Sequence, residues 1–376
     1  MKVFIDGIIF GRQHFGGISR IWEEYLARLP DYGVRLKLFV PFRRRNYALN
    51  RLLQQRERYE IVWDYFYWPL RYFGRVPVRS KILEWFLDDQ IDIFHSTYFT
   101  TVFNRKIKKV VTIHDMIPEL FEKGSRNRWV HFIIEMKRRV MENADKIIAI
   151  SQSTKEDILR VYPWIPPERI AVIYNSVSLH NAASGIPYEI LVEKYALDVR
   201  PKEYFLHVGF RNGYKNFELI PRLLEQDPSC RDWVFLCVGG EKDDMSPEII
   251  AAKGLSRNFR FLGFVPDDEL VTLYRNAIAL VYPSLYEGFG LPILEAMANE
   301  CPVVCSNTSS LPEVGGEAAI YFDPYSTESL KGAIVELLGR DREAIIAKGL
   351  ENTRRFSWEQ SVKDLVNIYA SLLRGE

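Results

Sequence analysis

Two glutamates eight residues apart are the residues of this chain whose type and spacing point most directly to chemistry. Glu287 and Glu295 flank the turn 288–292, which follows the apolar run 279–282. The run predicts a buried strand, and Pro292, with its fixed φ and no backbone N–H, suits the first turn of a helix. The N-terminus of that helix offers N–H donors and a partial positive charge to a phosphate. Because two carboxylates would repel the phosphate itself, we expect them to accept hydrogen bonds from sugar or ribose hydroxyls, which indicates a sugar nucleotide.

Two cations follow another expected strand. Arg211 and Lys215 come directly after the apolar run 204–208, in a loop that also contains Gly209 and Gly213. At the carboxyl end of a strand they can clamp a diphosphate, the arginine through its planar fork and the lysine as a point charge. The alternative is a pair of solvated loop cations.

Histidines and glycines mark the strand ends of the first half. Of the six histidines, His114 is the best placed, because it ends a buried run, and His95 is placed similarly with less support. A lone histidine at a strand end is more often a packed polar residue than a catalyst. The pair Gly16-Gly17 follows the first strand region and opens a helix. Its N–H groups can contact a phosphate or sugar, although the spacing lacks the full dinucleotide-binding pattern and also suits a simple tight turn.

The elements that must position these residues alternate between short apolar runs and longer amphipathic stretches, which is typical of parallel α/β sheets. We expect strands in the first half at 3–5, 36–40, 91–95, 110–113, 147–150 and 170–174, and in the second half at 204–208, 234–238, 260–262, 278–282, 303–305 and 319–321. Helices are expected at 18–29, 129–142, 154–162 (opening with a capping box at Ser153) and 358–373.

The polar segment from Asn175 to about Pro201 breaks this alternation and predicts a linker that contains a short helix. The predicted fold is therefore α/β, with two Rossmann-like parallel-sheet lobes, 1–178 and 179–376, that face a central cleft. The final helix, 357–374, is expected to pack back toward the N-terminal lobe. Ligands of such sheets bind beyond the carboxyl ends of the strands, so we expect both lobes to turn these ends to the cleft.

Residues 41–81 depart from the pattern. They contain ten Arg or Lys, three acids and ten aromatic residues. Basic residues mixed with aromatic ones suit an anionic membrane surface or a lipid-linked acceptor. The alternative is an ordinary insertion whose aromatic side chains pack under solvated arginines. Nucleic acid is disfavoured because no binding motif accompanies the patch.

Composition restricts the remaining classes of function. The chain has 376 residues, 47% of them hydrophobic, and a net charge of +1, which does not suggest a general polyanion binder. Four cysteines without a Cys-x-x-Cys pair fit a reduced, cytoplasmic protein. The N-terminus enters a strand directly and is not expected to be a signal peptide, and no apolar run reaches the roughly 18 residues of a transmembrane helix. We therefore expect a cytoplasmic protein that is soluble or held at the inner face of a membrane.

The segment Tyr282-Pro283-Ser284-Leu285-Tyr286 through Glu295-Ala296-Met297-Ala298 resembles the signature of the family 4 retaining glycosyltransferases, which are two-lobed GT-B enzymes. The Glu-x7-Glu pair is their hallmark. The resemblance spans most of the chain, and its loops resemble the mannosyltransferase-like members more than the glycogen synthases. Further matching pieces are Gly16-Gly17, Ile113-His114-Asp115, Arg211 with Lys215, Phe261-Leu262-Gly263-Phe264-Val265, Pro302-Val303-Val304 and Ser310-Leu311-Pro312-Glu313-Val314.

The resemblance implies a role for each matching residue. Arg211 and Lys215, with Gly16 and Gly17, would hold the donor diphosphate. Glu295 would bind the nucleotide ribose. The transferred sugar and phosphate would be bound by Glu287 and by the backbone of Phe289, Gly290 and Leu291, with His114 near the reacting sugar as the second catalytic residue. Phe264 and Val265 would lie near the base. Glu300 stands where the family usually has glycine after the helix, so Asn299 is expected to supply the left-handed cap.

The expected reaction is transfer rather than hydrolysis. A glycosidase also uses two carboxylates, but a phosphate-binding context has no role in its reaction. In transfer, the main task is to stabilise the negative charge that develops on the departing nucleoside diphosphate. Arg211, Lys215 and the helix near Pro292 can do this, and no Asp-x-Asp occurs in the chain. We therefore expect no metal and no cofactor, and the resemblance implies retention of anomeric configuration through attack on the same face.

The expected substrates are a nucleotide sugar, with GDP-mannose before UDP-sugars, and a glycan or lipid-linked acceptor in surface polysaccharide synthesis. Two alternatives remain open. One is a GT-B epimerase or phosphorylase, and the other is a non-catalytic partner that binds a sugar nucleotide or a membrane.

Overall fold

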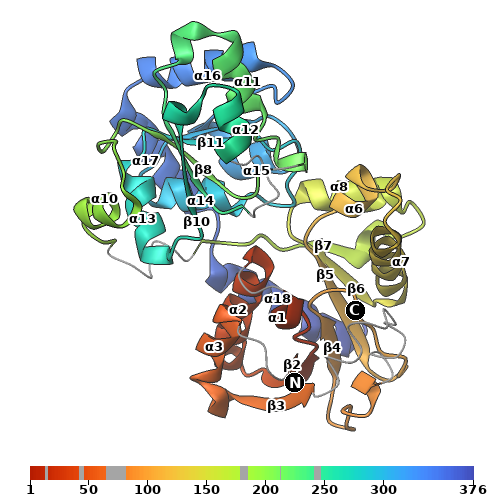
Figure 1. Cartoon of the computed structure of the whole chain (residues 1–376). Helices are drawn as coiled ribbons and strands as arrows, with labels where there is room; N and C mark the ends of the chain where they lie inside the picture. The colour runs from red at the N-terminus through yellow and green to blue at the C-terminus, as the bar shows by residue number, and fades with distance from the viewer. Residues whose placement is uncertain (13–15, 42–45, 65–81, 178–184, 212, 241–246) are drawn as a thin grey trace. The chain divides into compact units, whose positions relative to one another are not determined.

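The computed structural model describes residues 1–12, 16–41, 46–64, 82–177, 185–211, 213–240 and 247–376 (Figure 1). These residues form two compact units, the first made of Met1–Asn175 with Trp358–Glu376 and the second of Ser176–Ser357. Each unit is built on a parallel sheet with helices in the connections between its strands. The predicted α/β class with two Rossmann-like lobes is confirmed.

The described part of the first unit contains a seven-stranded sheet in the order β3-β2-β1-β4-β5-β6-β7. The central strands β1 and β4 are buried along their whole length, as expected for parallel strands covered on both faces. The chain adds β2 and β3 on one side of β1 and then β4 to β7 on the other, so the strand order reverses between β1 and β4, which pair in parallel. The strands are β1 (Lys2–Ile5), β2 (Arg35–Pro41), β3 (Tyr59–Asp64), β4 (Ile93–Ser96), β5 (Lys108–Ile113), β6 (Lys146–Ala149) and β7 (Ile170–Val172).

The last helix of the chain belongs to this first unit. Its residue Tyr369 places a buried hydroxyl 2.5 Å from Nδ1 of His95 on β4, and the ring of Trp358 packs edge-on against Tyr25 on α2. The helices are α1 (Ile9–Arg12), α2 (Gly17–Arg28), α3 (Tyr47–Leu53), α6 (Ile117–Phe121), α7 (Arg128–Asn143), α8 (Gln152–Val161) and α18 (Trp358–Arg374), with 3-10 turns η1 (Leu29–Tyr32), η2 (Arg56–Arg58) and η3 (Pro167–Arg169).

The described part of the second unit contains a six-stranded parallel sheet in the order β10-β9-β8-β11-β12-β13. The strands are β8 (Phe205–Val208), β9 (Phe235–Val238), β10 (Phe259–Gly263), β11 (Leu280–Tyr282), β12 (Val303–Ser306) and β13 (Ala319–Phe322). The chain builds one half of the sheet outward from β8 and then returns to build the other half from β11. The strand order therefore reverses between the neighbouring strands β8 and β11. Ligands of such sheets bind beyond the carboxyl ends of the strands at this point of reversal.

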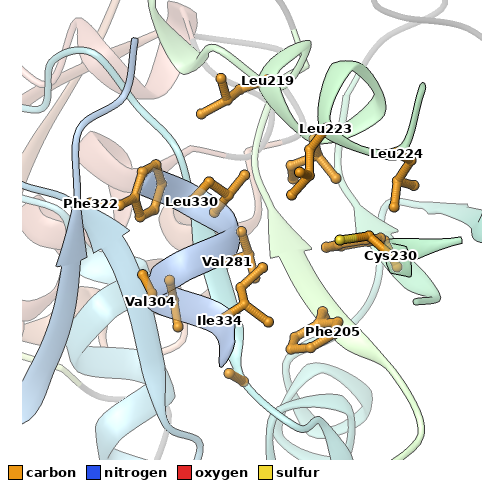
Figure 2. Close-up of a cluster of buried hydrophobic side chains, with 14 of the residues drawn as sticks. Phe205, Leu219, Leu223, Leu224, Cys230, Val281, Val304, Phe322, Leu330 and Ile334 are labelled. Atoms are coloured by element: carbon orange, nitrogen blue, oxygen red, sulfur yellow. The ribbon is translucent and has the colours of Figure 1, made fainter. Parts of the chain in front are cut away.

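The core of the second unit lies between this sheet and its helices. Figure 2 shows side chains of α11 and α16 pointing toward those of the strands, with Ile334 close to Val281. The helices are α10 (Tyr188–Tyr195), α11 (Leu219–Gln226), α12 (Pro247–Ala252), α13 (Asp267–Asn276), α14 (Leu291–Ala298), α15 (Leu311–Gly315), α16 (Thr327–Gly339) and α17 (Arg342–Thr353), with 3-10 turns η4 (Gly213–Lys215), η5 (Pro228–Cys230), η6 (Ser256–Asn258) and η7 (Gly316–Ala318).

One predicted segment is corrected by the structure. The interpretation of 41–81 as an insertion outside the α/β pattern is wrong for residues 47–64, which form α3, η2 and the edge strand β3. Charged residues concealed this strand, because Glu60 sits in it and is paired across the sheet with Lys2 at 2.7 Å and Lys37 at 2.9 Å. Residues 42–45 and 65–81, which carry much of the predicted basic and aromatic surface, lie outside the described residues.

Two predicted helix caps are also wrong. The N-cap of α8 is Ser151 rather than Ser153, and its hydroxyl oxygen accepts a hydrogen bond from the N–H of Thr154 at 3.0 Å. After α14 the left-handed residue is Glu300, with φ 59°, whereas Asn299 has φ −108°. The N–H groups of residues 300 and 301 bond back to the carbonyls of residues 297 and 296. This is the bonding pattern that usually recruits glycine at the left-handed position.

Candidate active site

The loops that follow β8 and β11 meet at the switch point of the second sheet. Lys215, in the turn η4 after β8, donates from Nζ to Oε1 of Glu287 at 2.7 Å. Glu287 lies in the loop that leaves β11, and the two side chains are only 12% and 11% exposed. Two predicted site residues that are 72 positions apart in the chain therefore form a largely buried ion pair.

Tyr282, the last residue of β11, completes this group. Its hydroxyl donates to Oε1 of Glu287 at 2.7 Å and accepts from Nζ of Lys215 at 3.1 Å. Burial, followed by the neighbouring Glu287 carboxylate, raises the pKa of Tyr282 well above its ordinary range, so the hydroxyl keeps its proton and acts as a donor. Sequence reasoning missed this residue because it ends an apolar run and was interpreted as part of the core.

Three consecutive hydroxyl side chains hold the loop that carries Glu287. Thr308 donates to the carbonyl of Leu285 at 3.0 Å, and Ser310 donates at 2.9 Å to the carbonyls of Glu287 and Phe289. The hydroxyl oxygen of Ser309 accepts the N–H of Glu287 at 2.9 Å. Because each bond is made to the backbone, these residues fix the path of the loop. The sequence signal for them is the hydroxyl run 308–310, which ends on the first residue of the segment 310–314.

The helix α14 begins directly behind this loop. Its N-cap Gly290 has φ 98°, and a Cβ at this position would lie 2.9 Å from Cδ2 of Leu311. Pro292 stands in the first turn, so the predicted start of the helix is confirmed. The positive end of the helix dipole and the backbone of Leu291 are thus presented just after the Glu287 loop. Position 290 therefore requires glycine, both for its positive φ and for the space that a Cβ would occupy.

Glu295 lies one turn further along α14. It is 8% exposed, and its Oε2 accepts a hydrogen bond from the buried hydroxyl of Tyr274 on α13 at 3.1 Å. Each glutamate of the pair is therefore oriented by a tyrosine from a different element. Tyr274, like Tyr282, was not predicted as a site residue.

Arg211 lies in the same loop after β8 as Lys215, but its side chain has different partners. Its Nη1 donates to the carbonyl of Gly239 after β9 at 2.6 Å, and its guanidinium carbon lies 4.8 Å from the ring centre of Phe261 on β10. Gly240, with φ 86°, leaves room for it, since a Cβ there would lie 2.3 Å from Nη1. The two predicted diphosphate ligands thus sit on either side of the loop after β8, one by β9 and one by β11.

The predicted base-binding residues differ in exposure. Phe264, just beyond β10, is 59% exposed and can offer its ring to a ligand. Val265 is 4% exposed, so its side chain is part of the core and only its backbone can be offered. Of the two, Phe264 is suited to stacking on a base.

In the first unit, His114 directly follows β5 and is 8% exposed. Neither ring nitrogen has a hydrogen-bond partner among the described residues. Burial lowers the pKa of His114 to about 4, so the ring is neutral near pH 7. An imidazole with both nitrogens unused in a buried position is suited to receive a ligand with hydroxyl groups.

His95 contrasts with His114 in its partners. Its Nδ1 lies 2.5 Å from the hydroxyl of Tyr369 and its Nε2 lies 2.9 Å from that of Thr112. Both nitrogens are therefore occupied within the core, as expected for a packed polar residue.

The glycine pair opens α2, with Gly16 as the N-cap and Gly17 as the first residue of the helix. Gly16 has φ 176°, which is extended backbone, and its carbonyl accepts a hydrogen bond from the hydroxyl of Ser19 at 2.9 Å. The preceding residues 13–15 lie outside the described part of the chain. The predicted helix start is confirmed, whereas the role of the pair in binding phosphate stays a prediction.

Two kinds of feature are absent from the residues that the structure describes. No group of three or more His, Cys, Asp or Glu side chains is placed there to hold a metal ion. None of the helices described is both long enough and apolar enough to cross a membrane.

Two family models match this chain. "Glycosyltransferase Family 4" matches residues 15–181, and "Glycosyl transferases group 1" matches residues 194–356. O-antigen chain mannosyltransferase B of Escherichia coli is 33% identical over 301 residues, which cover 77% of this chain and 77% of that protein. The serotype-specific mannosyltransferase WbdA of Escherichia coli is 30% identical over 286 residues, which cover 71% of this chain and 34% of WbdA.

Solved structures agree on the fold. Sucrose-phosphate synthase from Thermosynechococcus elongatus has a TM-score of 0.74 at 17% identity, over 100% of this chain and 99% of that one. WaaG, a glycosyltransferase involved in lipopolysaccharide biosynthesis, has a TM-score of 0.68 at 16% identity, over the whole of both chains. The two Rossmann-like units are thus those of the GT-B fold. With the family matches, they show that this chain belongs to the family 4 glycosyltransferases, as predicted, and that it is a glycosyltransferase.

Proposed function

We propose that this enzyme transfers a sugar, with retention of configuration and without a metal ion, from a nucleotide sugar to a glycan or lipid-linked acceptor in the synthesis of a surface polysaccharide. The observation that carries the proposal is the buried group of Lys215, Glu287 and Tyr282 at the switch point of the second sheet. In this group Lys215 can bind a phosphate and Glu287 can accept hydrogen bonds from sugar hydroxyls, and Glu287 lies shortly before the N-terminus of α14.

The donor diphosphate is assigned to the positive groups of this site. Lys215 supplies a mobile point charge, Arg211 a planar fork, and the start of α14 a set of aligned peptide dipoles. All three stabilise the negative charge that develops on the departing nucleoside diphosphate. This supply of positive charge from the chain itself supports a reaction that needs no metal ion.

The hydroxyl groups of the donor are assigned to the two carboxylates. Glu295, held by Tyr274 on α14, is proposed to accept hydrogen bonds from the ribose, and Glu287 from the transferred sugar. We propose that His114 binds a sugar hydroxyl, which its neutral ring and unoccupied nitrogens suit. Phe264 is proposed to stack on the base because of its exposed ring.

Retention fits a same-face attack in which a leaving phosphate oxygen takes the proton of the acceptor hydroxyl. The bond from the sugar to the phosphate oxygen breaks, and the bond to the acceptor oxygen forms on the side that the phosphate leaves. The acceptor proton then resides on the nucleoside diphosphate. In this sequence Lys215 and α14 keep the phosphate charge localised, while Glu287 orients the sugar.

The proposed sugar is mannose, with GDP-mannose as the first donor to test and UDP-sugars next. Support comes from the names of the relatives, of which O-antigen chain mannosyltransferase B and WbdA are mannosyltransferases. These names also support surface polysaccharide as the product.

We further propose a cytoplasmic location with peripheral contact at the membrane. The four cysteines are free and buried, which fits a reducing compartment. Within the segment 41–81 proposed for this contact, Arg51 is engaged by Glu23 and Arg58 by Asp31. Contact with the membrane or with a lipid-linked acceptor is therefore proposed for the other residues of 41–81, of which 42–45 and 65–81 lie outside the described residues.

The test is incubation of the purified protein with GDP-mannose, UDP-glucose and ADP-glucose in the presence of EDTA and a lipid-linked glycan acceptor. We expect release of one nucleoside diphosphate together with a new glycosidic bond in the product. Lys215→Ala and Glu295→Ala are expected to lower the rate at least tenfold. Unchanged release in both variants would show that the site is elsewhere, and a product without a new glycosidic bond would select an epimerase or phosphorylase.

A further inference from the structure

Tyr282 stands between two charged groups that the proposed reaction uses differently. Its hydroxyl donates its single proton to Glu287 and accepts a hydrogen bond from the ammonium of Lys215. The same ammonium lies 5.4 Å from the centre of the Tyr282 ring. The hydroxyl is therefore fixed in direction by both neighbours, and the tyrosine side chain is 1% exposed.

The direct bond between Lys215 and Glu287 raises a difficulty for donor binding. In the present arrangement the ammonium is engaged by the carboxylate at 2.7 Å. A phosphate that recruits Lys215 would leave Glu287, which is 8% exposed, with less compensation for its buried charge. Loss of a partner from a buried charged group is strongly unfavourable. A second donor to the same carboxylate oxygen reduces this cost.

We propose that Tyr282 is a positioning residue that allows Lys215 to turn toward the donor phosphate while Glu287 stays charged and oriented. The hydroxyl holds Oε1 of Glu287, and the tyrosine ring, 5.4 Å from the ammonium, keeps Lys215 at the site. Lysine has three N–H donors, so Lys215 can bond to a phosphate and still reach the tyrosine oxygen. This role rests on the proposed function of the second unit as the donor site.

A similar arrangement at the second glutamate supports the inference. Oε2 of Glu295 accepts from the hydroxyl of Tyr274, which is fully buried on α13. Both carboxylates of the Glu-x7-Glu pair are thus restrained by a tyrosine hydroxyl rather than by cations alone. A tyrosine hydroxyl is a neutral donor, so it can fix the direction of a carboxylate while the lysine stays available to the phosphate.

The test is a double-mutant cycle on nucleoside diphosphate affinity. GDP, UDP and ADP are each titrated into the full-length protein by calorimetry, and the one that binds is used throughout. Tyr282→Phe is expected to weaken binding about fivefold, because the hydroxyl that donates to Glu287 and accepts from Lys215 is lost. In a Lys215→Met background the same substitution is expected to change the affinity less than twofold, since the residue through which it acts is absent.

The control is Tyr204→Phe in the same unit, whose buried hydroxyl donates to the carbonyl of Leu273 at 2.8 Å. It is expected to leave the affinity within twofold of wild type. Equal weakening by Tyr282→Phe in both backgrounds would overturn the positioning role and leave the proposed function standing. If none of the three diphosphates binds the wild-type protein, the proposed function fails and the role of Tyr282 fails with it.

A second variant keeps the inference testable if Tyr282→Phe does not fold. Glu287→Gln preserves the shape of the loop but removes the charge that competes with phosphate for Lys215. It is expected to bind the nucleoside diphosphate at least as tightly as wild type. Binding tenfold weaker than wild type would show that Lys215 does not pass from the carboxylate to the phosphate.

Discussion

Removal of the lysine from the buried ion pair is expected to destabilise the protein measurably. Lys215→Met leaves Glu287 without its cation in a place where both side chains are about nine-tenths buried, at 12% and 11% exposure. Removing one partner of a buried pair typically costs about 3–5 kcal/mol, because a buried charge remains unpaired. The hydroxyl of Tyr282 still donates to the carboxylate, which retains about 1–2 kcal/mol. We therefore expect the free energy of unfolding to fall by about 1–4 kcal/mol.

The double variant separates the charge from the packing. Lys215→Met with Glu287→Gln removes both charges and keeps the side-chain lengths similar, so no unpaired charge remains. We expect its free energy of unfolding to return to within about 1 kcal/mol of wild type. Urea unfolding at pH 7, without any nucleotide, measures all four proteins of the cycle.

A surface pair in the same unit provides the control. Lys253 bonds to Glu225 at 3.0 Å, but the side chains are 28% and 35% exposed. Lys253→Met is expected to cost less than about 1 kcal/mol. Two results would refute the reasoning about Lys215: a loss no larger than that of the surface control, or a double variant whose loss equals the sum of the two single losses.

Three further outcomes are expected. Glu300→Gly, which relieves a left-handed residue with φ 59° after α14, should stabilise the protein by about 0.5–1 kcal/mol in urea unfolding, and an unchanged midpoint would contradict this. Gly290→Ala, with φ 98° and a Cβ 2.9 Å from Leu311, should destabilise it by about 2 kcal/mol and lower turnover, whereas near-native values of both would show that the loop adapts. Burial lowers the pKa of His114 from 6.5 to about 4, so its contribution to stability is present above pH 6.5 and is lost as the pH falls toward 4. The advantage of wild type over His114→Gln should therefore shrink by about 3 kcal/mol between pH 7 and pH 4, and a constant difference in unfolding free energy would argue against a neutral buried ring.

The order of elements in this chain could be predicted from local patterns. Parallel strands buried on both faces need uninterrupted apolar runs, so twelve predicted runs correspond to strands whose ends lie within two residues of those observed. The exception is β3, an edge strand that mixes charged residues into its sequence. Its Glu60 is satisfied by Lys2 and Lys37 from β1 and β2, and such a partner across strands has no local signal.

The exact ends of the helices were harder to predict from local sequence than the helices themselves. Both Ser151 and Ser153 are suitable N-caps by type, and the helix uses the earlier one, two residues after the end of strand β6 at Ala149. A glutamate at a left-handed position, as at Glu300, contradicts local preference and is held by the bonds of residues 300 and 301 back into α14.

For the site, local sequence identifies the chemical groups and the loops that carry them. Glu287, Glu295, Arg211 and Lys215 were recognisable because carboxylates and cations next to glycine turns have few structural uses. Their partners depend on how the strands are ordered in the sheet. The strand order brings the loop after β8 beside the loop after β11, which joins Lys215 to Glu287 across 72 residues. It also converted Tyr282 from an apparent core residue into the donor between them, because a hydroxyl acquires its role from what lies within about 3 Å of it, and that distance is set by the fold.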